Sequence, residues 1–279
     1  MKTEKLGTTR NFGFTLGRTA EGERKDYEAL EKRLAEQERA KTNPPAQPIV
    51  VPASSGDFWT IPGVNYRGNV VDVQLLKNYL DNGNAKTQDD WARYSEQARA
   101  KGEFYLPDYP LFFATLERAY ALKTDATIEE MRKKVQKLSR AKWLMTTTRI
   151  KYANKGKDKI VHNYGMSDPQ KLEEPFVGAD GTIPSGSPET LYQKLLGTQS
   201  SVANINSVFK WLNGTDAYMY RVNSKPNKLD ERVAAGFDAD SDWAYFDCDR
   251  IPTNTNTGLG VRYARRVAPS IVGKNGGTR

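Results

Sequence analysis

The sequence predicts an α+β fold with a helical N-terminal half, a mainly antiparallel sheet in the C-terminal half and a flexible N-terminal arm. Apolar residues recur at the helical spacing of three to four from residue 49 to Trp143, and at a spacing of two beyond it. A polar, proline-rich stretch precedes residue 49. The chain has 279 residues, of which 38% are hydrophobic, so it can bury a sizeable core. We therefore expect a single globular α+β domain over residues 49–268.

Residues 1–48 are expected to form an arm outside this domain. Tyr27, Leu30 and Leu34 make a single apolar stripe among dense alternating charges, which predicts one short charged helix. Residues 43–48 include three prolines, which cannot continue a helix. This stretch therefore predicts a stiff, extended linker between the arm and the domain.

The first half of the domain carries signals for helices. Thr87 followed by Asp90, and Thr127 followed by Glu130, each match the start of a capped helix. We expect helices over residues 71–80, 87–100 and 110–122, and a fourth that begins at Thr127. The apolar face of the fourth helix consists of Ile128, Met131, Val135 and Leu138. Its opposite face presents Lys133, Lys137 and Arg140.

Beyond Trp143 the pattern is that of short strands. A hairpin is predicted from residues 146–152 and 157–164, because the Asn and Gly between them suit a turn. A long loop over residues 165–187 follows. Two more helices are expected, over residues 187–196 and 202–212. The remaining strands are expected over residues 217–222, 232–237, 243–248 and 260–266, before a mobile tail at 269–279.

The positive charge of the chain is concentrated in one segment. Residues 131–160 carry eleven basic residues and one acid, whereas the whole chain has a net charge of +8. A surface of this charge density attracts anions, and phosphate backbones in particular. We therefore predict non-enzymatic binding of nucleic acid or another polyanion, with tyrosines stacking on exposed bases. The predicted contact residues are Lys133, Lys134, Lys137, Arg140, Lys142, Arg149, Lys151, Tyr152, Lys155, Lys157, Lys159 and Tyr164.

Three other interpretations of the basic segment stay open. Its lysines can decorate a solvated helix and a hairpin tip, or be neutralised by the protein's own acids. Residues 230–249 carry seven acids and one base, so basic and acidic faces of neighbouring copies would suit a structural protein that assembles head to tail into homo-oligomers. The third interpretation is an enzyme that holds an anionic substrate with lysine or arginine.

The sequence excludes several classes of catalytic and metal site. Cys248 is the only cysteine and His162 the only histidine, which removes thiolate clusters and multi-histidine zinc sites. No phosphate-loop, nucleophile-elbow or dinucleotide-binding motif occurs. Residues 238–242 have the alternating aspartates of a calcium loop, but Trp243 stands where such loops need glycine. We expect no metal, no cofactor, and a binding role rather than catalysis.

The sequence also bears on where the protein works. No secretory signal is recognisable at the N-terminus, and no apolar run reaches the roughly 20 residues that span a bilayer. A single cysteine fits a reducing compartment. We therefore expect a cytoplasmic protein that does not contact membranes, in which His162 and Cys248 are structural residues of strands.

Four segments carry a resemblance to other proteins. They are Trp143 to Tyr152, Val161 to Gly165, Glu231 to Phe237 and Leu259 to Tyr263. These segments resemble parts of uncharacterised proteins from archaea and bacteria with small genomes. The resemblance covers the C-terminal half, on the order of 130 residues, and implies no function.

Overall fold

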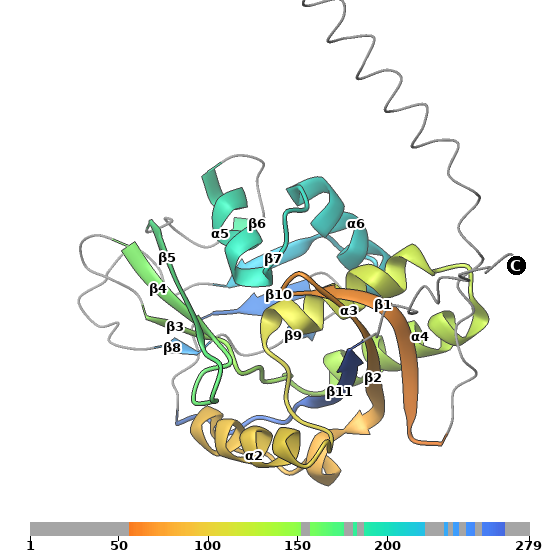
Figure 1. Cartoon of the computed structure of the whole chain (residues 1–279). Coiled ribbons are helices and arrows are strands. Elements are labelled where there is room, and N and C mark those ends of the chain that lie inside the picture. The colour runs from red at the N-terminus through yellow and green to blue at the C-terminus, as the bar shows by residue number, and fades with distance from the viewer. Residues whose placement is uncertain are drawn as a thin grey trace, which may run out of the picture. The chain divides into compact units, whose positions relative to one another are not determined.

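The computed structural model describes residues 56–151, 157–175, 181–182, 187–220, 232–233, 237–239, 244–248 and 253–265 (Figure 1). All of them belong to the compact unit Val50–Arg279. The expected arm over residues 1–48 and the expected tail over residues 269–279 lie outside the described residues, so both stay predictions. The fold is α+β, with five α-helices and three small sheets in the described part of the chain.

The expected helical N-terminal half is wrong, because the described chain begins with two strands. These are β1 (Phe58–Tyr66) and β2 (Asn69–Tyr79), which pair antiparallel. Val71, Val73 and Leu75 are buried in β2, and partly exposed residues alternate with them, so residues 71–80 have the period of a strand. Valine also favours strands, because its branched side chain packs well on a pleated sheet.

The other expected helices are confirmed, with small shifts at their ends. The helices are α2 (Gln88–Ala100), α3 (Tyr109–Ala121), α4 (Ala126–Ala141), α5 (Ser187–Leu196) and α6 (Val202–Asn213), and a short 3-10 helix, η1 (Leu80–Gly83), follows β2. The Thr87 side chain caps α2 by accepting a hydrogen bond from the Asp90 backbone N–H, as expected. In α4 the cap is Asp125 instead of Thr127. The expected apolar face of α4 is buried.

The strands form three sheets instead of one. The remaining strands are β3 (Arg149–Lys151), β4 (Lys157–His162), β5 (Gln170–Pro175), β6 (Gly181–Thr182), β7 (Ala217–Tyr220), β8 (Arg232–Val233), β9 (Phe237–Ala239), β10 (Ala244–Asp247) and β11 (Leu259–Arg265). The strand orders are β1-β2-β11, β5-β4-β3-β8 and β6-β7-β10-β9. Among the described pairs, β7 and β10 are parallel and the others antiparallel.

Part of the expected loop over residues 165–187 is strand. β5 pairs with β4 from His162 to Lys157, and β6 pairs with β7. β5 is an edge strand, and the exposed positions described in it are polar, so its sequence lacks the alternation that marks a half-buried strand.

Helix α3 occupies the centre of the fold. It contacts β1 on one side and α5 and α6 on another (Figure 1). The Phe113 ring of α3 stacks on Phe209 of α6, whose ring meets Phe246 of β10 edge to face. These fully buried rings join the helices to the third sheet. In the described part of the chain, every helix is too short or too polar to cross a membrane.

Candidate functional site

The structure separates the predicted contact residues into two groups. Helix α4 carries Lys133, Lys134 and Lys137 and lies on the right of Figure 1. Strands β3 and β4 carry Lys151 and Lys159 and lie on the left. The basic segment therefore does not form one continuous groove from helix to hairpin in the described part of the chain.

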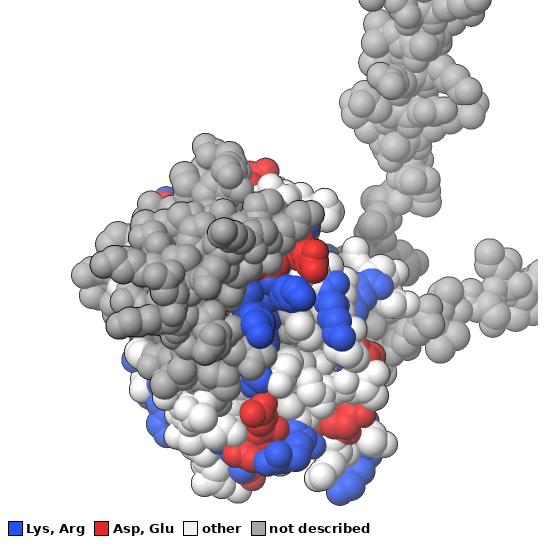
Figure 2. Space-filling view, turned by 90° about the vertical axis from the view of Figure 1, so that its left-hand side faces the viewer, with Lys and Arg blue, Asp and Glu red and all other residues white. Residues whose placement is uncertain are grey.

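The hairpin lysines Lys151 and Lys159 are exposed. Figure 2 looks onto the left-hand side of Figure 1, where their sheet lies, and its visible part shows basic side chains interspersed with acidic and uncharged ones. A surface of mixed charge attracts a polyanion weakly. Tyr152, Lys155 and the side chain of Lys157 lie outside the described residues.

Arg149 and Tyr164 make contacts inside the protein. Arg149 is only 3% exposed, and its Nε donates to Gln88 Oε1 at 2.7 Å. Its Nη2 donates to Asp89 Oδ1 at 2.7 Å, and its guanidinium lies 3.4 Å from the centre of the Tyr164 ring. The arginine thus ties β3 to α2, and the tyrosine covers it.

Two further basic residues hold α4 and the turn after it in place. Arg140 Nη2 donates to the Asn213 carbonyl at 3.1 Å, at the end of α6. Lys142 Nζ lies 5.3 Å from the centre of the Tyr79 ring, and the Tyr79 hydroxyl donates to the Leu138 carbonyl at 2.9 Å. These contacts fix α4 against α6 and β2.

The outward face of α4 and the end of the first hairpin enclose a cleft of about 520 Å³, which we call the lysine cleft. Lys133 and Lys137 are one helical turn apart, and Lys134 lies three residues before Lys137, so all three reach the same side. Lys77 joins them from β2. The cleft is lined by Gly56, Asp57, Trp59, Lys77, Asn78, Glu130, Lys133, Lys134 and Lys137.

The charges of the lysine cleft are only partly balanced. Lys77 Nζ lies 3.6 Å from Glu130, and Lys133 Nζ lies 3.7 Å from Glu129. Lys134 and Lys137 have no ion-pair partner among the described residues. The cleft therefore presents cationic groups that are free to meet an anion.

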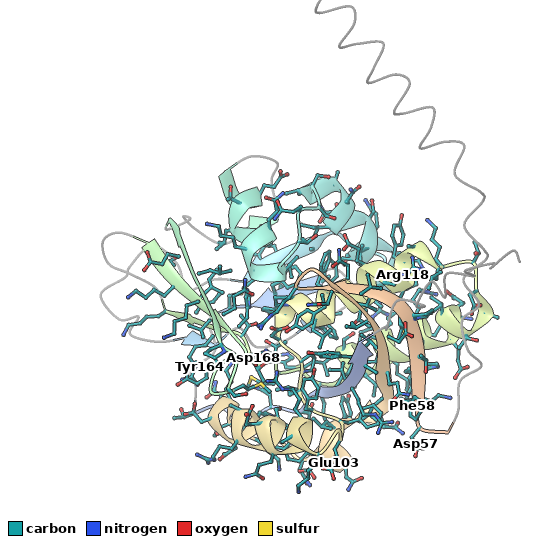
Figure 3. The ribbon with its side chains drawn as sticks, viewed as in Figure 1. Asp57, Phe58, Glu103, Arg118, Tyr164 and Asp168 are labelled. Carbon is teal, nitrogen blue, oxygen red and sulfur yellow. The ribbon has the colours of Figure 1, made fainter. Side chains whose placement is uncertain are left out.

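The floor of the lysine cleft is aromatic. The Trp59 ring is 1% exposed, and Lys77 Nζ lies 5.5 Å from its centre. The buried Nε1–H of Trp59 has no hydrogen-bond acceptor in the described structure. Asp57 lies at the open end of the hairpin, at the lower end of β1 in Figure 3.

His162 is a structural residue, in line with the expectation from its strand position. Its Nε2 contacts the Lys194 carbonyl at 2.9 Å, so this nitrogen carries the proton. Nδ1 then accepts from the Thr148 hydroxyl at 3.0 Å, and Thr148 Oγ1 accepts from the Tyr109 backbone N–H at 3.0 Å. Burial lowers the pKa of His162 below its ordinary value.

A second polar cluster, not identified from the sequence, surrounds Asp108. The Asp108 carboxylate is fully buried and caps α3 through the Leu111 backbone N–H. It also accepts from the Tyr66 hydroxyl at 2.9 Å and from Arg67 Nη2 at 3.1 Å. Burial, and then Asp108, raise the pKa of Tyr66. Arg67 has a positive φ of 50° in the turn between β1 and β2, which these contacts hold in place.

Asp168 extends this cluster towards solvent. Arg99 Nη2 donates to its Oδ1 at 2.7 Å, Asn163 Nδ2 donates to the same oxygen at 3.1 Å, and Arg67 Nη1 lies 3.4 Å from Oδ2. Figure 3 shows Asp168 beside Tyr164, between α2 and the β3 and β4 strands. Beside Asp168 lies a cavity of about 310 Å³, which we call the tyrosine pocket. It is lined by Arg99, Gly102, Glu103, Tyr105, Asp168, Arg262 and Tyr263.

Comparisons with protein families, with curated proteins and with solved structures found no match to this chain. Within the described residues, no group of three or more His, Cys, Asp or Glu side chains is placed to hold a metal ion. Of residues 230–249, whose acidity suggests head-to-tail assembly, ten are described, and none of the acidic side chains is among the described ones. The lysine cleft and the tyrosine pocket are therefore the two candidate sites.

Proposed function

We propose that this protein binds nucleic acid, or another polyanion, without catalysing a reaction, and that the lysine cleft makes the contact. The observation that carries the proposal is the cleft itself. Lys134 and Lys137 are unpaired among the described residues, and Lys133 has only the long contact to Glu129. Lys77 faces them across a groove that is open to solvent.

Phosphate is the anion that best suits this arrangement. Lysine ammonium groups act as mobile point charges, which neutralise a flexible phosphate backbone without requiring a fixed geometry. Consecutive phosphates of a single strand can follow the row of lysines along α4, since the side chains lie on one helix face. The cleft offers no rigid set of donors for base edges, so we expect weak sequence preference.

We also propose that the protein works in the cytoplasm, as the composition of the chain predicts. The alternatives of head-to-tail assembly and of an enzyme on an anionic substrate stay predictions from the sequence. Neither is favoured by a contact among the described residues.

The test replaces Lys133, Lys134 and Lys137 together by Gln and measures binding of a labelled single-stranded oligonucleotide by fluorescence anisotropy. Each phosphate neutralised on a single strand contributes a slope of about −0.7 to log K against log salt. We therefore expect the triple variant to lose affinity at low salt, and its salt dependence to become shallower by about 2.

A matched control removes the same charge elsewhere. Replacing Lys151, Lys159 and Lys171 by Gln on the strands β3, β4 and β5 also lowers the net charge by three. This control is expected to keep most of the wild-type affinity and slope. Equal losses in the two triple variants would mean that overall charge, and not the cleft, drives binding.

A further inference from the structure

We propose that the tyrosine pocket binds a small organic molecule with a single carboxylate group. The pocket lies between the C-terminal end of α2 and β11 and is separate from the lysine cleft, with which it shares no lining residue. Its volume of about 310 Å³ is at the lower end of the range for small-molecule sites. The proposal is independent of nucleic-acid binding.

The central residue of this site is Tyr105, which lines the pocket. Its side chain is only 4% exposed, and no hydrogen bond to its hydroxyl is formed by the described residues. The neighbouring buried tyrosine, Tyr66, uses its hydroxyl on Asp108. The fully buried polar atoms that lack a partner do not include the Tyr105 hydroxyl oxygen, so this oxygen is reached from the pocket, where a ligand or water can satisfy it. Burial raises the pKa of Tyr105, so this hydroxyl stays protonated and available as a donor.

The backbone holds Tyr105 rigidly in this position. Its N–H donates to the Val261 carbonyl at 2.9 Å, and the Val261 N–H donates back to the Tyr105 carbonyl at 2.8 Å. The Tyr263 ring, two residues further along β11, meets Tyr105 edge to face, with 6.3 Å between ring centres. The Tyr263 hydroxyl likewise has no partner among the described residues. Two tyrosines whose hydroxyls have no protein partner among the described residues thus line the same pocket.

Two arginines complete the donor set. Arg99 uses Nη2 on Asp168 and Ser167, which leaves Nε and Nη1 without an acceptor in the described structure. Arg262 is fixed by its Nε contact to Gln74 at 2.8 Å and its Nη1 contact to the Gly102 carbonyl at 3.4 Å, and it lies over the Phe104 ring at 4.8 Å. Each arginine can therefore donate single charged N–H groups to a carboxylate, Arg99 from Nε or Nη1 and Arg262 from Nη2.

The charge balance of the pocket selects a ligand with one negative charge. Two arginines line it, and so do two acids, Asp168 and Glu103. Asp168 is already held by Arg99 and Arg67. A doubly charged phosphate monoester would meet these carboxylates, whereas a single carboxylate can face the free donors and place its apolar body against the tyrosine rings.

The experiment uses benzoate as the carboxylate probe and benzamide as its neutral analogue, with calorimetric titration of the full-length protein. We expect benzoate to bind with a dissociation constant of about 1 mM or tighter. Benzamide should bind at least about tenfold more weakly, because it lacks the charge that strengthens hydrogen bonds from arginine and tyrosine. Tyr105→Phe removes only the hydroxyl and should weaken benzoate about tenfold.

The control variant is Tyr120→Phe, which makes the same chemical change outside the pocket, on α3. It should bind benzoate like the wild type. Tyr105→Phe should also keep the wild-type melting temperature to within about 2 °C, because its hydroxyl has no protein partner to lose. Tyr263→Phe gives an independent measure of the second hydroxyl and should also weaken benzoate.

Three results would overturn the proposal. One is the absence of benzoate binding up to about 10 mM. Another is equal benzoate affinity in the wild type and in both tyrosine variants. The third is tighter binding of benzamide or of inorganic phosphate than of benzoate, since the pocket would then not select a single carboxylate.

Discussion

His162 links three segments of the chain through one imidazole ring. Its Nε2–H meets the end of α5, and its Nδ1 meets Thr148, which in turn accepts from the first residue of α3. Both nitrogens are used in the neutral form. A second proton on Nδ1 would replace an accepted hydrogen bond by a clash of two donors, unless the Thr148 hydroxyl turned away.

This geometry predicts how stability depends on pH. Burial lowers the pKa of His162 in the folded protein below its ordinary value of 6.5. Below pH 6.5 the unfolded chain therefore binds a proton that the folded chain does not. We expect the free energy of unfolding to fall from pH 7.5 to 5.5 by about 1 kcal/mol, as measured by urea denaturation.

The chain offers a simple control, because His162 is its only histidine. His162→Gln has no side chain at this position that titrates in the same range, so its free energy of unfolding should be lower but nearly constant between pH 7.5 and 5.5. A wild-type protein with constant stability over this range would contradict the assignment of a buried, neutral ring.

The two candidate sites differ in how far they can be predicted residue by residue. Lys133 and Lys137 can be placed on one exposed face from their spacing, because helical periodicity is a local signal. That Lys77 lines the same cleft cannot be predicted from the sequence, because the pairing of β1 with β2 brings it there. The pairing of Arg67 with Asp168 joins residues 101 positions apart. No local pattern predicts a contact over that separation.

At the scale of elements, the junction between α5 and α3 depends on a glycine. Gly197 follows α5 with a φ of +61°, and a Cβ atom there would lie 2.6 Å from Pro110 Cβ in the first turn of α3. Gly214 ends α6 with a φ of +85°, and a Cβ atom there would have nothing within 4 Å. The two positions therefore share a left-handed backbone, which would strain any other residue, but only Gly197 also lacks room for a side chain.

This pair gives a matched test. Gly214→Ala should cost about 1–2 kcal/mol of unfolding free energy, from the left-handed backbone alone. Gly197→Ala should cost about 1–3 kcal/mol more, because the new methyl group must displace Pro110 and with it the start of α3. Chemical denaturation of both variants measures the difference. Equal costs would show that α3 and α5 can separate freely at this junction.

The sequence predicts the helices of this fold better than its strands, for a physical reason. The face of α4 formed by Ile128, Met131, Val135 and Leu138 repeats over three turns, and caps mark where helices start. A strand is defined by partners that are remote in sequence. The sequence of β2 fits a helix as well as a strand, because its apolar residues match both periods over a short stretch, and β5 gives no alternating signal because it lies at an edge.

At the scale of the whole molecule, the first sheet is closed by β11, the last strand of the described residues. β11 pairs with β2 from Val71 to Tyr79, and Val261 also bonds to Tyr105. A chain that ends at Gly258 lacks these partners and leaves one edge of β2 unpaired. We expect it to lose cooperative thermal unfolding by circular dichroism, whereas a chain that ends at residue 268 should keep it.

The glycines of β11 show how closely this strand packs. A Cβ atom at Gly260 would lie 2.7 Å from both Leu76 and Leu80. Retention of a cooperative transition by the shorter chain would mean that the first two strands and the helices fold without β11, and would contradict the dependence on closure.

The same closure sets the order of events when the protein is made. Leu259 pairs with Tyr79, and at about 5–20 residues per second the ribosome needs on the order of 10 to 40 seconds to synthesise the chain between them. Throughout that time the nascent chain holds β2 with an open edge. Native pairing of the first sheet is therefore completed only after Leu259 has been synthesised, and β1 and β2 must be kept from pairing with other chains until then.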